Sequence, residues 1–391
     1  MKLLCIVSSL DLTQPFSATP AWWQLLKGLY EQGVEVLATT YQGPAIETLW
    51  WRALPNPVKR EGDLFKTLRD MAHLLPARGM NTGQSAESPS DRLQRQVAQS
   101  VLGPRWRAFM DRTLTAQPDI DAVLFLTIPL NHVVGLAAYV RQKFNKPVLY
   151  YDGDVPASLP AYAGFATGFK MYQGADPAEY DAFISNSAGG ADTLCEMGAR
   201  SVHVLYYGAD PDVFSPVEIE QNLDVFFYGH TREYREDWID GMICYASEHL
   251  PEARFAVRGR KLGNVGRAVT LPYLSLRKLR EYACRSKINL CVTRKAHATV
   301  FASSSSRPFE LASLGACIVS NPYLGIETWF EPGKEIVVVQ DREEAVERYR
   351  WLLAHDSERR AIGSAARQRV LKEHTFRHRA KQLVEIVRNY V

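Results

Sequence analysis

The 391-residue sequence has few cysteines and no long hydrophobic run. Its 6 cysteines are scattered, and they form neither a CxxC pair nor the Cys/His spacing of a zinc site. This pattern indicates buried thiols in a reducing compartment and implies no metal site. No apolar run reaches the roughly 18 residues of a membrane-spanning helix, and the apolar start MKLLCIVSSL is too short for a signal peptide. We therefore expect a cytoplasmic protein.

The net charge of the chain is small as well. The 46 basic and 43 acidic residues leave a formal charge of +3, which is too small and too mixed to predict a nucleic-acid partner. A hydrophobic fraction of 46% and a charged fraction of 23% are typical of globular proteins. Because the chain exceeds what one compact core usually holds, its length favours two domains.

Short apolar runs alternate with helix-like segments through most of the chain. In the first half, the sequence predicts strands over residues 2–10, 34–41, 121–129, 147–154, 181–187 and 201–207. Helices are predicted between them, over residues 21–33, 131–144 and 187–197. A second series of strands covers residues 223–230, 253–259, 288–294, 316–322 and 335–341, and three helices follow at 343–354, 357–373 and 376–390. Such apolar strands suit parallel sheets that are covered on both faces.

The two series predict two α/β domains and a terminal helix. The first domain covers residues 1–208 and contains an insertion from about 42 to 110, interpreted as helices joined by a loop near 76–91. The second domain covers residues 209–375, because turn-forming segments cluster in GADPDVFSPVEIEQN. Residues 376–391 form the last helix, whose apolar stripe must be buried either within this chain or against a second subunit.

The segment SSSSRPFELASLGACIVSNP, residues 303–322, carries the strongest site signal. Pro308 is a natural first residue of a helix, which places Glu310 about one turn in and Gly315 just past the end. In a parallel α/β sheet, such a helix start lies where phosphate binds, with Arg307 as a further donor and Glu310 as an acceptor for a ribose diol. The alternative is that Glu310 offsets the helix dipole and pairs with Arg307.

SKINLCVTR, the segment SSSSRPFELASLGACIVSNP and the stretch from GIETWFEPGKE to HRAKQLV together resemble the C-terminal domain of GT-B glycosyltransferases. The similarity covers roughly residues 180–385 and is greatest for the spore maturation protein B-like branch. It implies an α/β fold with two Rossmann-like domains facing across a cleft, a terminal helix that crosses back, and a donor site in the second domain. Glu310 matches the ribose-binding glutamate, whereas a first glutamate of the related two-glutamate motif is replaced by Ala302.

Further donor-side candidates follow from their position after predicted strands, beside the segment that contains Glu310. They are Gly229, His230, Arg232, Arg235, Arg258, Arg294, Ser306, Arg307, Pro308 and Phe309. Glycine allows the backbone to approach a pyrophosphate, and arginine neutralises it. A single arginine at such a place can equally be a surface charge or part of an ion pair.

Three residues are candidates on the acceptor side. Asp152 and Asp154 follow a predicted strand in YYDGDVP, and His132 follows another. A carboxylate here can act as general base toward the acceptor hydroxyl. The alternative is a turn in which aspartates bind their own backbone.

These features lead to one main hypothesis and two alternatives. The main hypothesis is a hexosyltransferase-like enzyme that transfers a sugar from a UDP-, GDP- or dTDP-linked donor to an unknown saccharide, protein or small molecule. It needs no cofactor and no metal, because arginines and helix dipoles stabilise the diphosphate. Loss of the first glutamate favours the first alternative, an inactive nucleotide-binding or scaffold protein. A nucleotide-sugar epimerase is the other.

Overall fold

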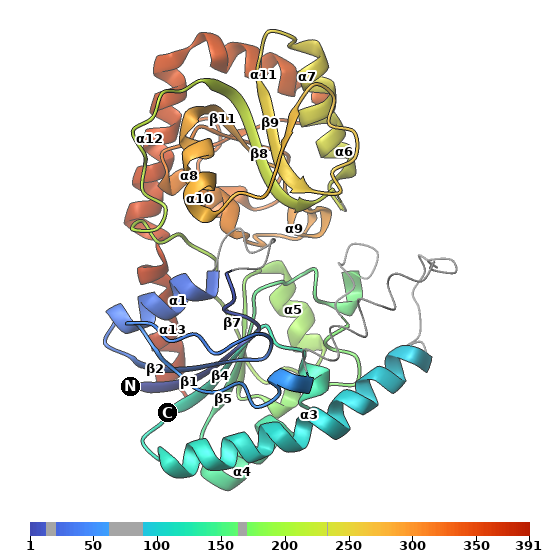
Figure 1. The fold of residues 1–391 in the computed structure, drawn as a ribbon, viewed down its shortest axis with the longest axis vertical. Coiled ribbons are helices and arrows are strands. Elements are labelled where there is room, and N and C mark those ends of the chain that lie inside the picture. Colours follow the sequence, from blue (N-terminus) through green and yellow to red (C-terminus); the bar gives the residue numbers. More distant parts are fainter. Residues whose placement is uncertain (13–20, 62–88, 163–169, 233) are drawn as a thin grey trace. The chain divides into compact units, whose positions relative to one another are not determined.

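The computed structural model describes residues 1–12, 21–61, 89–162, 170–232 and 234–391 (Figure 1). Contacts divide the chain into two compact units. Unit 1 contains Met1–Asp11, Leu25–Leu205 and Ala380–Val391, and unit 2 contains Leu12–Gln24 and Tyr206–Arg379. The loop expected near 76–91 falls largely outside the described residues. No helix of the described parts is long and apolar enough to cross a membrane.

Unit 1 is built on a seven-stranded parallel sheet in the order β3-β2-β1-β4-β5-β6-β7. The strands are β1 (Lys2–Val7), β2 (Glu35–Thr40), β3 (Arg52–Ala53), β4 (Ala122–Leu126), β5 (Val148–Asp152), β6 (Ala182–Ser185) and β7 (Val202–Val204). The central strands form because they are continuous apolar runs that the sheet buries on both faces; every residue of β4 and β5 is buried.

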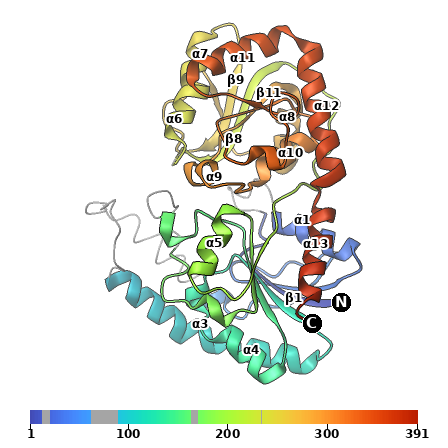
Figure 2. The same cartoon turned by 180° about the vertical axis from the view of Figure 1, so that it is seen from behind.

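The helices of unit 1 cover this sheet. In the described part of the chain they include most of α1 (Ala21–Glu31), α3 (Pro89–Ala116), α4 (Leu136–Phe144), α5 (Gly189–Glu196) and the last part of α13 (Phe376–Arg388), with short 3-10 turns η1 (Leu130–His132), η2 (Pro160–Tyr162) and η3 (Pro177–Glu179). Trp106 of α3 and Val140 of α4 pack into one core with Leu4 and Phe125 of the sheet. Both views show α13 beside α1 (Figures 1 and 2).

Unit 2 contains a six-stranded parallel sheet in the order β10-β9-β8-β11-β12-β13. Its strands are β8 (Leu223–Thr231), β9 (Phe255–Arg260), β10 (Val269–Leu271), β11 (Ser286–Cys291), β12 (Ile318–Ser320) and β13 (Val337–Val338). Numbered from β8, this is the 3-2-1-4-5-6 order of the Rossmann fold. The two parallel sheets confirm the α/β prediction.

Helices cover both faces of the unit 2 sheet. They are α6 (Glu236–Ile239), the π-helical turn η4 (Asp240–Tyr245), α7 (Ala246–His249), α8 (Leu276–Arg285), α9 (Lys295–Thr299), α10 (Ser306–Ser313), the 3-10 turn η5 (Ile326–Thr328), α11 (Arg342–Ala354) and α12 (Asp356–Glu373). Ile243 and Tyr349 pack with Phe227 on one face. Phe226, the neighbour of Phe227 in β8, faces the other way and packs against Tyr282 of α8 at 5.8 Å between ring centroids.

Several predicted boundaries were wrong. The helix around Glu310 begins at Ser306, so Pro308 is its third residue and not its first. Proline is tolerated there because the first four N–H groups of a helix have no partner within it. The helix expected over 131–144 is interrupted by a turn that contains Gly135 in a left-handed conformation with φ 77°. The last predicted strand shrinks to Val337–Val338.

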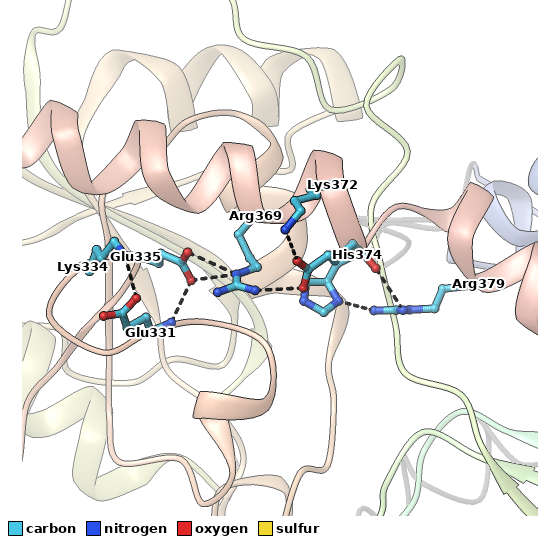
Figure 3. A network of polar contacts seen from close by, with 8 residues as sticks. Glu331, Lys334, Glu335, Arg369, Lys372, His374 and Arg379 are labelled. Carbon is cyan, nitrogen blue, oxygen red and sulfur yellow. Dashed lines mark hydrogen bonds and ion pairs between the residues drawn. The ribbon is translucent and has the colours of Figure 1, made fainter.

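A chain of charged contacts fastens the end of α12 to the loop after β12 (Figure 3). Arg369 donates from Nε to both carboxylate oxygens of Glu335 at 3.2 Å and from Nη1 to Glu373 at 2.9 Å. Glu335 also accepts the backbone N–H of Glu331. At the far end, Arg379 donates to Nδ1 of His374 at 2.7 Å. The network fixes the residues at which α12 ends and α13 begins.

We expect Arg369→Ala to lower the free energy of unfolding. The side chain of Glu335 is only 8% exposed and would keep a partly buried charge with one partner fewer. Hydrogen bonds to charged groups contribute about 1.5–3 kcal/mol, so a loss of that order is expected in urea unfolding. Arg360→Ala on the same helix is the control, because Arg360 is 73% exposed in its pair with Asp356. Equal effects of both variants would contradict the prediction.

Candidate functional site

The strand order of unit 2 marks one crevice before any side chain is considered. Strand β8 lies between β9 and β11, so the chain leaves β8 toward β9 and leaves β11 in the opposite direction, toward β12. Ligands of parallel α/β sheets bind outside the carboxyl ends of the strands at such a reversal. The residues that follow β8 and β11 are therefore the first candidates.

Two of the predicted arginines meet at the end of β11. The carbonyl oxygen of Val292 accepts hydrogen bonds from Nε of Arg235 at 3.1 Å and from Nη1 of Arg307 at 2.9 Å. The shared carbonyl holds two positive guanidinium groups close together in spite of their repulsion. Because the arginine fork matches phosphate oxygens, this pair can bind a polyvalent anion.

Arg307 also packs against the middle of β8. Its guanidinium carbon is 5.3 Å from the ring centroids of both Phe227 and Tyr228, two neighbours whose side chains leave opposite faces of the strand. Its Nε is buried and has no hydrogen-bond partner among the described residues. A buried donor without a partner costs free energy, so its presence favours a functional role for this guanidinium.

The start of α10 adds a third source of positive potential. Arg307 lies in the first turn of this helix, and the N-cap residue Ser305 has an extended backbone and makes no side-chain capping bond. The N–H groups of a first turn and the helix dipole attract anions. Together with the arginines, they make the crevice suited to a diphosphate.

Arg294 is the third predicted arginine of this region. It directly precedes α9, and its Nη2 lies 3.3 Å from Nε2 of His297. His297 is only 2% exposed. Burial, followed by the charges of Arg294 and Arg235, lowers its pKa well below the ordinary value. His297 is therefore a neutral imidazole beside two arginines.

Glu310 lies beneath this region. It is fully buried, and its Oε2 accepts a hydrogen bond from the hydroxyl of Tyr228 at 3.2 Å. Burial, and then the charge of Glu310, raise the pKa of Tyr228 well above its ordinary range, so Tyr228 remains a donor. A carboxylate with no exposed surface cannot meet a ribose in this conformation, so the expected contact would require its surroundings to open.

Gly229 has a different role from the expected one. β8 continues past it to Thr231, and its pairing with β9 shifts register between Tyr228 and Thr231, which indicates a bulge. A Cβ on Gly229 would lie 2.6 Å from the ring of Phe227 and 3.5 Å from Nη2 of Arg307. Glycine is thus needed for packing beneath Arg307. The next residue, His230, lies in the strand, but its side chain is outside the described part of the structure.

Two other predicted arginines, Arg232 and Arg258, already interact with neighbouring groups of the protein. Arg232 donates to the carbonyl oxygens of Leu262 and Asn264 at 2.9 Å, and its other terminal nitrogen contacts Asp240. Arg258 is 5% exposed, its guanidinium lies 5.4 Å from the ring centroid of Tyr273, and burial lowers its pKa. These contacts favour structural roles for Arg232 and Arg258.

The other predicted site residues of α10 differ in how deeply they are buried. Ser306 is the first residue of the helix and is half-buried. Pro308 and Phe309 are buried, and Phe309 packs against the rings of Trp329, Phe330 and His374. Phe309 is therefore a core residue that anchors the helix.

Ala302, at the position that the resemblance assigns to a first glutamate, lies in the loop before α10. Ala302 is fully buried and has a left-handed backbone with φ 46°. Its N–H donates to Leu324, and a Cβ on Gly325 would come within 2.6 Å of its nitrogen. A long charged side chain does not suit this packing.

On the acceptor side, Asp152 lies in a buried hydrogen-bonded cluster, and its role as a general base stays a prediction. It is fully buried at the end of β5, and its Oδ2 accepts from Ser158 at 2.5 Å and Tyr172 at 2.7 Å. Its Oδ1 accepts the N–H of Asp154 at 2.9 Å. Burial raises the pKa of Asp152 to about 6, against the lowering effect of its donors. The turn interpretation fits Asp152.

Asp154 and His132 stay candidates. Asp154 is half-buried, two residues past the end of β5. His132 ends η1 after β4, and its Nδ1 lies 2.5 Å from the hydroxyl oxygen of Tyr41. Burial lowers the pKa of His132 to about 4, so its imidazole is neutral near pH 7. No group of three or more metal-ligating side chains occurs among the described residues.

Sequence reasoning missed the Val292 carbonyl, Tyr228 and His297. Val292 is an apolar residue, and its backbone oxygen accepts the hydrogen bonds of the two arginines. No sequence signal reveals this role of a backbone atom. Tyr228 could have been found from LDVFFYGH, because alternation in β8 places it on the face of Phe226. His297 lies in CVTRKAH, three residues after Arg294, which is a contact spacing in a helical turn.

Comparisons with known proteins agree with this architecture. Residues 235–385 match the family described as Glycosyl transferase-like, which is less than half of the chain. The chain resembles HepE of Anabaena, solved with UDP-glucose, at 13% identity and a TM-score of 0.61, with 100% of both chains covered. The present chain has the GT-B fold. No curated protein matches the sequence.

Two further solved GT-B structures cover the chain from end to end. Sucrose-phosphate synthase of Thermosynechococcus elongatus is 14% identical with a TM-score of 0.63, covering 99% of this chain and 98% of its own. The trehalose-6-phosphate synthase OtsA is 12% identical with a TM-score of 0.68 and 100% coverage of both chains. At such identities the likeness concerns the fold, and the site residues rest on their own geometry.

Proposed function

We propose that this protein is a glycosyltransferase that takes a hexosyl group from a nucleoside-diphosphate sugar bound by unit 2. The observation that carries the proposal is the convergence of Arg235 and Arg307 on the Val292 carbonyl, at the strand-order reversal and beside the start of α10. The glycosyltransferase-like match over residues 235–385 and the UDP-glucose bound to HepE support it.

In the proposed reaction, the bond between the anomeric carbon and the diphosphate oxygen breaks as the acceptor hydroxyl forms a new bond to that carbon. The acceptor proton passes to a base, for which Asp154 or His132 is the candidate, and the nucleoside diphosphate leaves with the electron pair. Negative charge on the diphosphate oxygens is greatest at this point, so the arginines stabilise the transition state more than the bound donor. This chemistry needs no divalent ion, and metal independence belongs to the proposal.

The proposal is tested by incubating the protein with UDP-, GDP- and dTDP-linked sugars in the presence of EDTA and measuring released nucleoside diphosphate. We expect slow hydrolysis of one donor, since water can replace the acceptor. Hydrolysis that occurs only after manganese is added would overturn metal independence. The absence of both binding and hydrolysis for every donor would overturn the function.

A second candidate is an inactive nucleotide-binding protein of the same fold. Ala302 favours it, because this fully buried alanine with a left-handed backbone stands at the position that the resemblance assigns to a first glutamate. Tight binding of a nucleoside diphosphate without any turnover of its sugar, in the same panel, would support this candidate.

A further inference from the structure

The guanidinium of Arg294 has an imidazole, that of His297, as a hydrogen-bond partner. Nε2 of the buried imidazole lies 3.3 Å from Nη2 of the guanidinium. A guanidinium only donates hydrogen bonds, so Nε2 must accept and the ring proton must lie on Nδ1. That Nδ1 is buried without a hydrogen-bond partner among the described residues. The fold therefore accepts an unsatisfied donor in order to hold an uncharged acceptor beside Arg294.

An uncharged acceptor has a particular consequence for an anion site. A carboxylate would fix the guanidinium equally well, but it would also cancel the charge that attracts phosphate. The imidazole fixes the geometry and leaves the charge in place. It stays neutral because it is buried and because Arg294 and Arg235 both oppose its protonation.

We propose that His297 is a positioning residue that orients Arg294 for the diphosphate without neutralising it. The inference rests on the proposed function for its ligand, but only the binding of a diphosphate anion is needed to test it. Inorganic pyrophosphate is therefore the probe, and its affinity is measured by calorimetry at several salt concentrations.

His297→Glu is expected to weaken pyrophosphate binding by about 10-fold or more and to flatten its dependence on salt, because one cation of the site is then paired internally. His297→Gln keeps a neutral acceptor, and its affinity should stay within about 3-fold of the wild type. His249→Glu changes the net charge by the same amount at an exposed position of α7, so it is the control and should bind pyrophosphate like the wild type.

A second variant keeps the proposal testable if the glutamate variant fails to fold. His297→Leu removes the acceptor without adding charge, and it should weaken pyrophosphate binding while leaving the salt dependence steep. The proposal is overturned if the leucine or the glutamate variant binds as tightly as wild type, or if glutamine loses as much as glutamate.

The two proposals fail in different ways. If the wild type does not bind pyrophosphate, the positioning role of His297 is wrong. If the wild type binds pyrophosphate and the variants behave as expected, but no nucleotide sugar is bound or turned over, the glycosyltransferase assignment fails and the positioning role stands.

Discussion

Replacing Arg307 by alanine is expected to weaken the binding of nucleoside diphosphate about 10- to 150-fold, which corresponds to the loss of one charged hydrogen bond of about 1.5–3 kcal/mol. Several structural features of the proposed donor site meet at Arg307. It shares the Val292 carbonyl with Arg235, lies in the first turn of α10 and contacts the rings of Phe227 and Tyr228 in β8. Calorimetric titration of the variant with UDP, GDP and dTDP measures the effect.

Two further variants separate binding from packing. Arg307→Lys keeps a positive charge but loses the planar fork, so it should recover only part of the affinity. Arg342→Ala is the matched control, because the Arg342 guanidinium also stacks on an aromatic ring of unit 2, 4.5 Å from the centroid of Tyr245. If Arg307→Ala is folded and binds as tightly as the wild type, or if Arg342→Ala is equally impaired, Arg307 is not a donor ligand.

The sheets and the helix that begins in SSSSRPFEL could be predicted from the sequence because their signals are local. An apolar run such as AVLFL becomes a strand buried on both faces, and the start of the helix in SSSSRPFEL must lie at the carboxyl end of a parallel sheet. Both expectations depend on neighbouring residues alone. They hold even though the start of α10 was misplaced by two residues.

The contacts that assign roles could not be predicted because they join distant segments. Tyr228 and Glu310 are 82 positions apart, and they meet only because β8 and α10 pack together. Arg235 and Arg307 meet at Val292 because β8 and β11 are adjacent. Sequence reasoning could not rank the five candidate arginines, so Arg232, which binds two carbonyls, looked the same as Arg307.

The burial of Asp152, which sequence reasoning did not foresee, leads to a second large expected effect. Its pKa of about 6 in the folded protein lies above the value of about 3.9 expected in the unfolded chain. Between these pH values the native state holds a proton that the unfolded state has lost. The free energy of unfolding should therefore fall by about 3 kcal/mol from this group as the pH rises from about 4 to above 6.

Asp152→Asn should abolish that dependence, because an amide does not ionise and the hydroxyls of Ser158 and Tyr172 can turn to bind it. In urea unfolding at about pH 4 and about pH 8, the stability of the variant relative to the wild type should improve by about 2–3 kcal/mol at the higher pH.

Asp111→Asn provides a control of opposite sign. Asp111 accepts hydrogen bonds from Lys143 and Tyr139, which lower its pKa, so its ionised form contributes stability that is lost as the pH falls. The variant should therefore lose stability relative to the wild type as the pH rises. If the stability of Asp152→Asn relative to the wild type is instead independent of pH, the raised pKa of Asp152 is wrong. Only a carboxylate that ionises over the same pH range in the folded protein as in the unfolded chain leaves no such dependence.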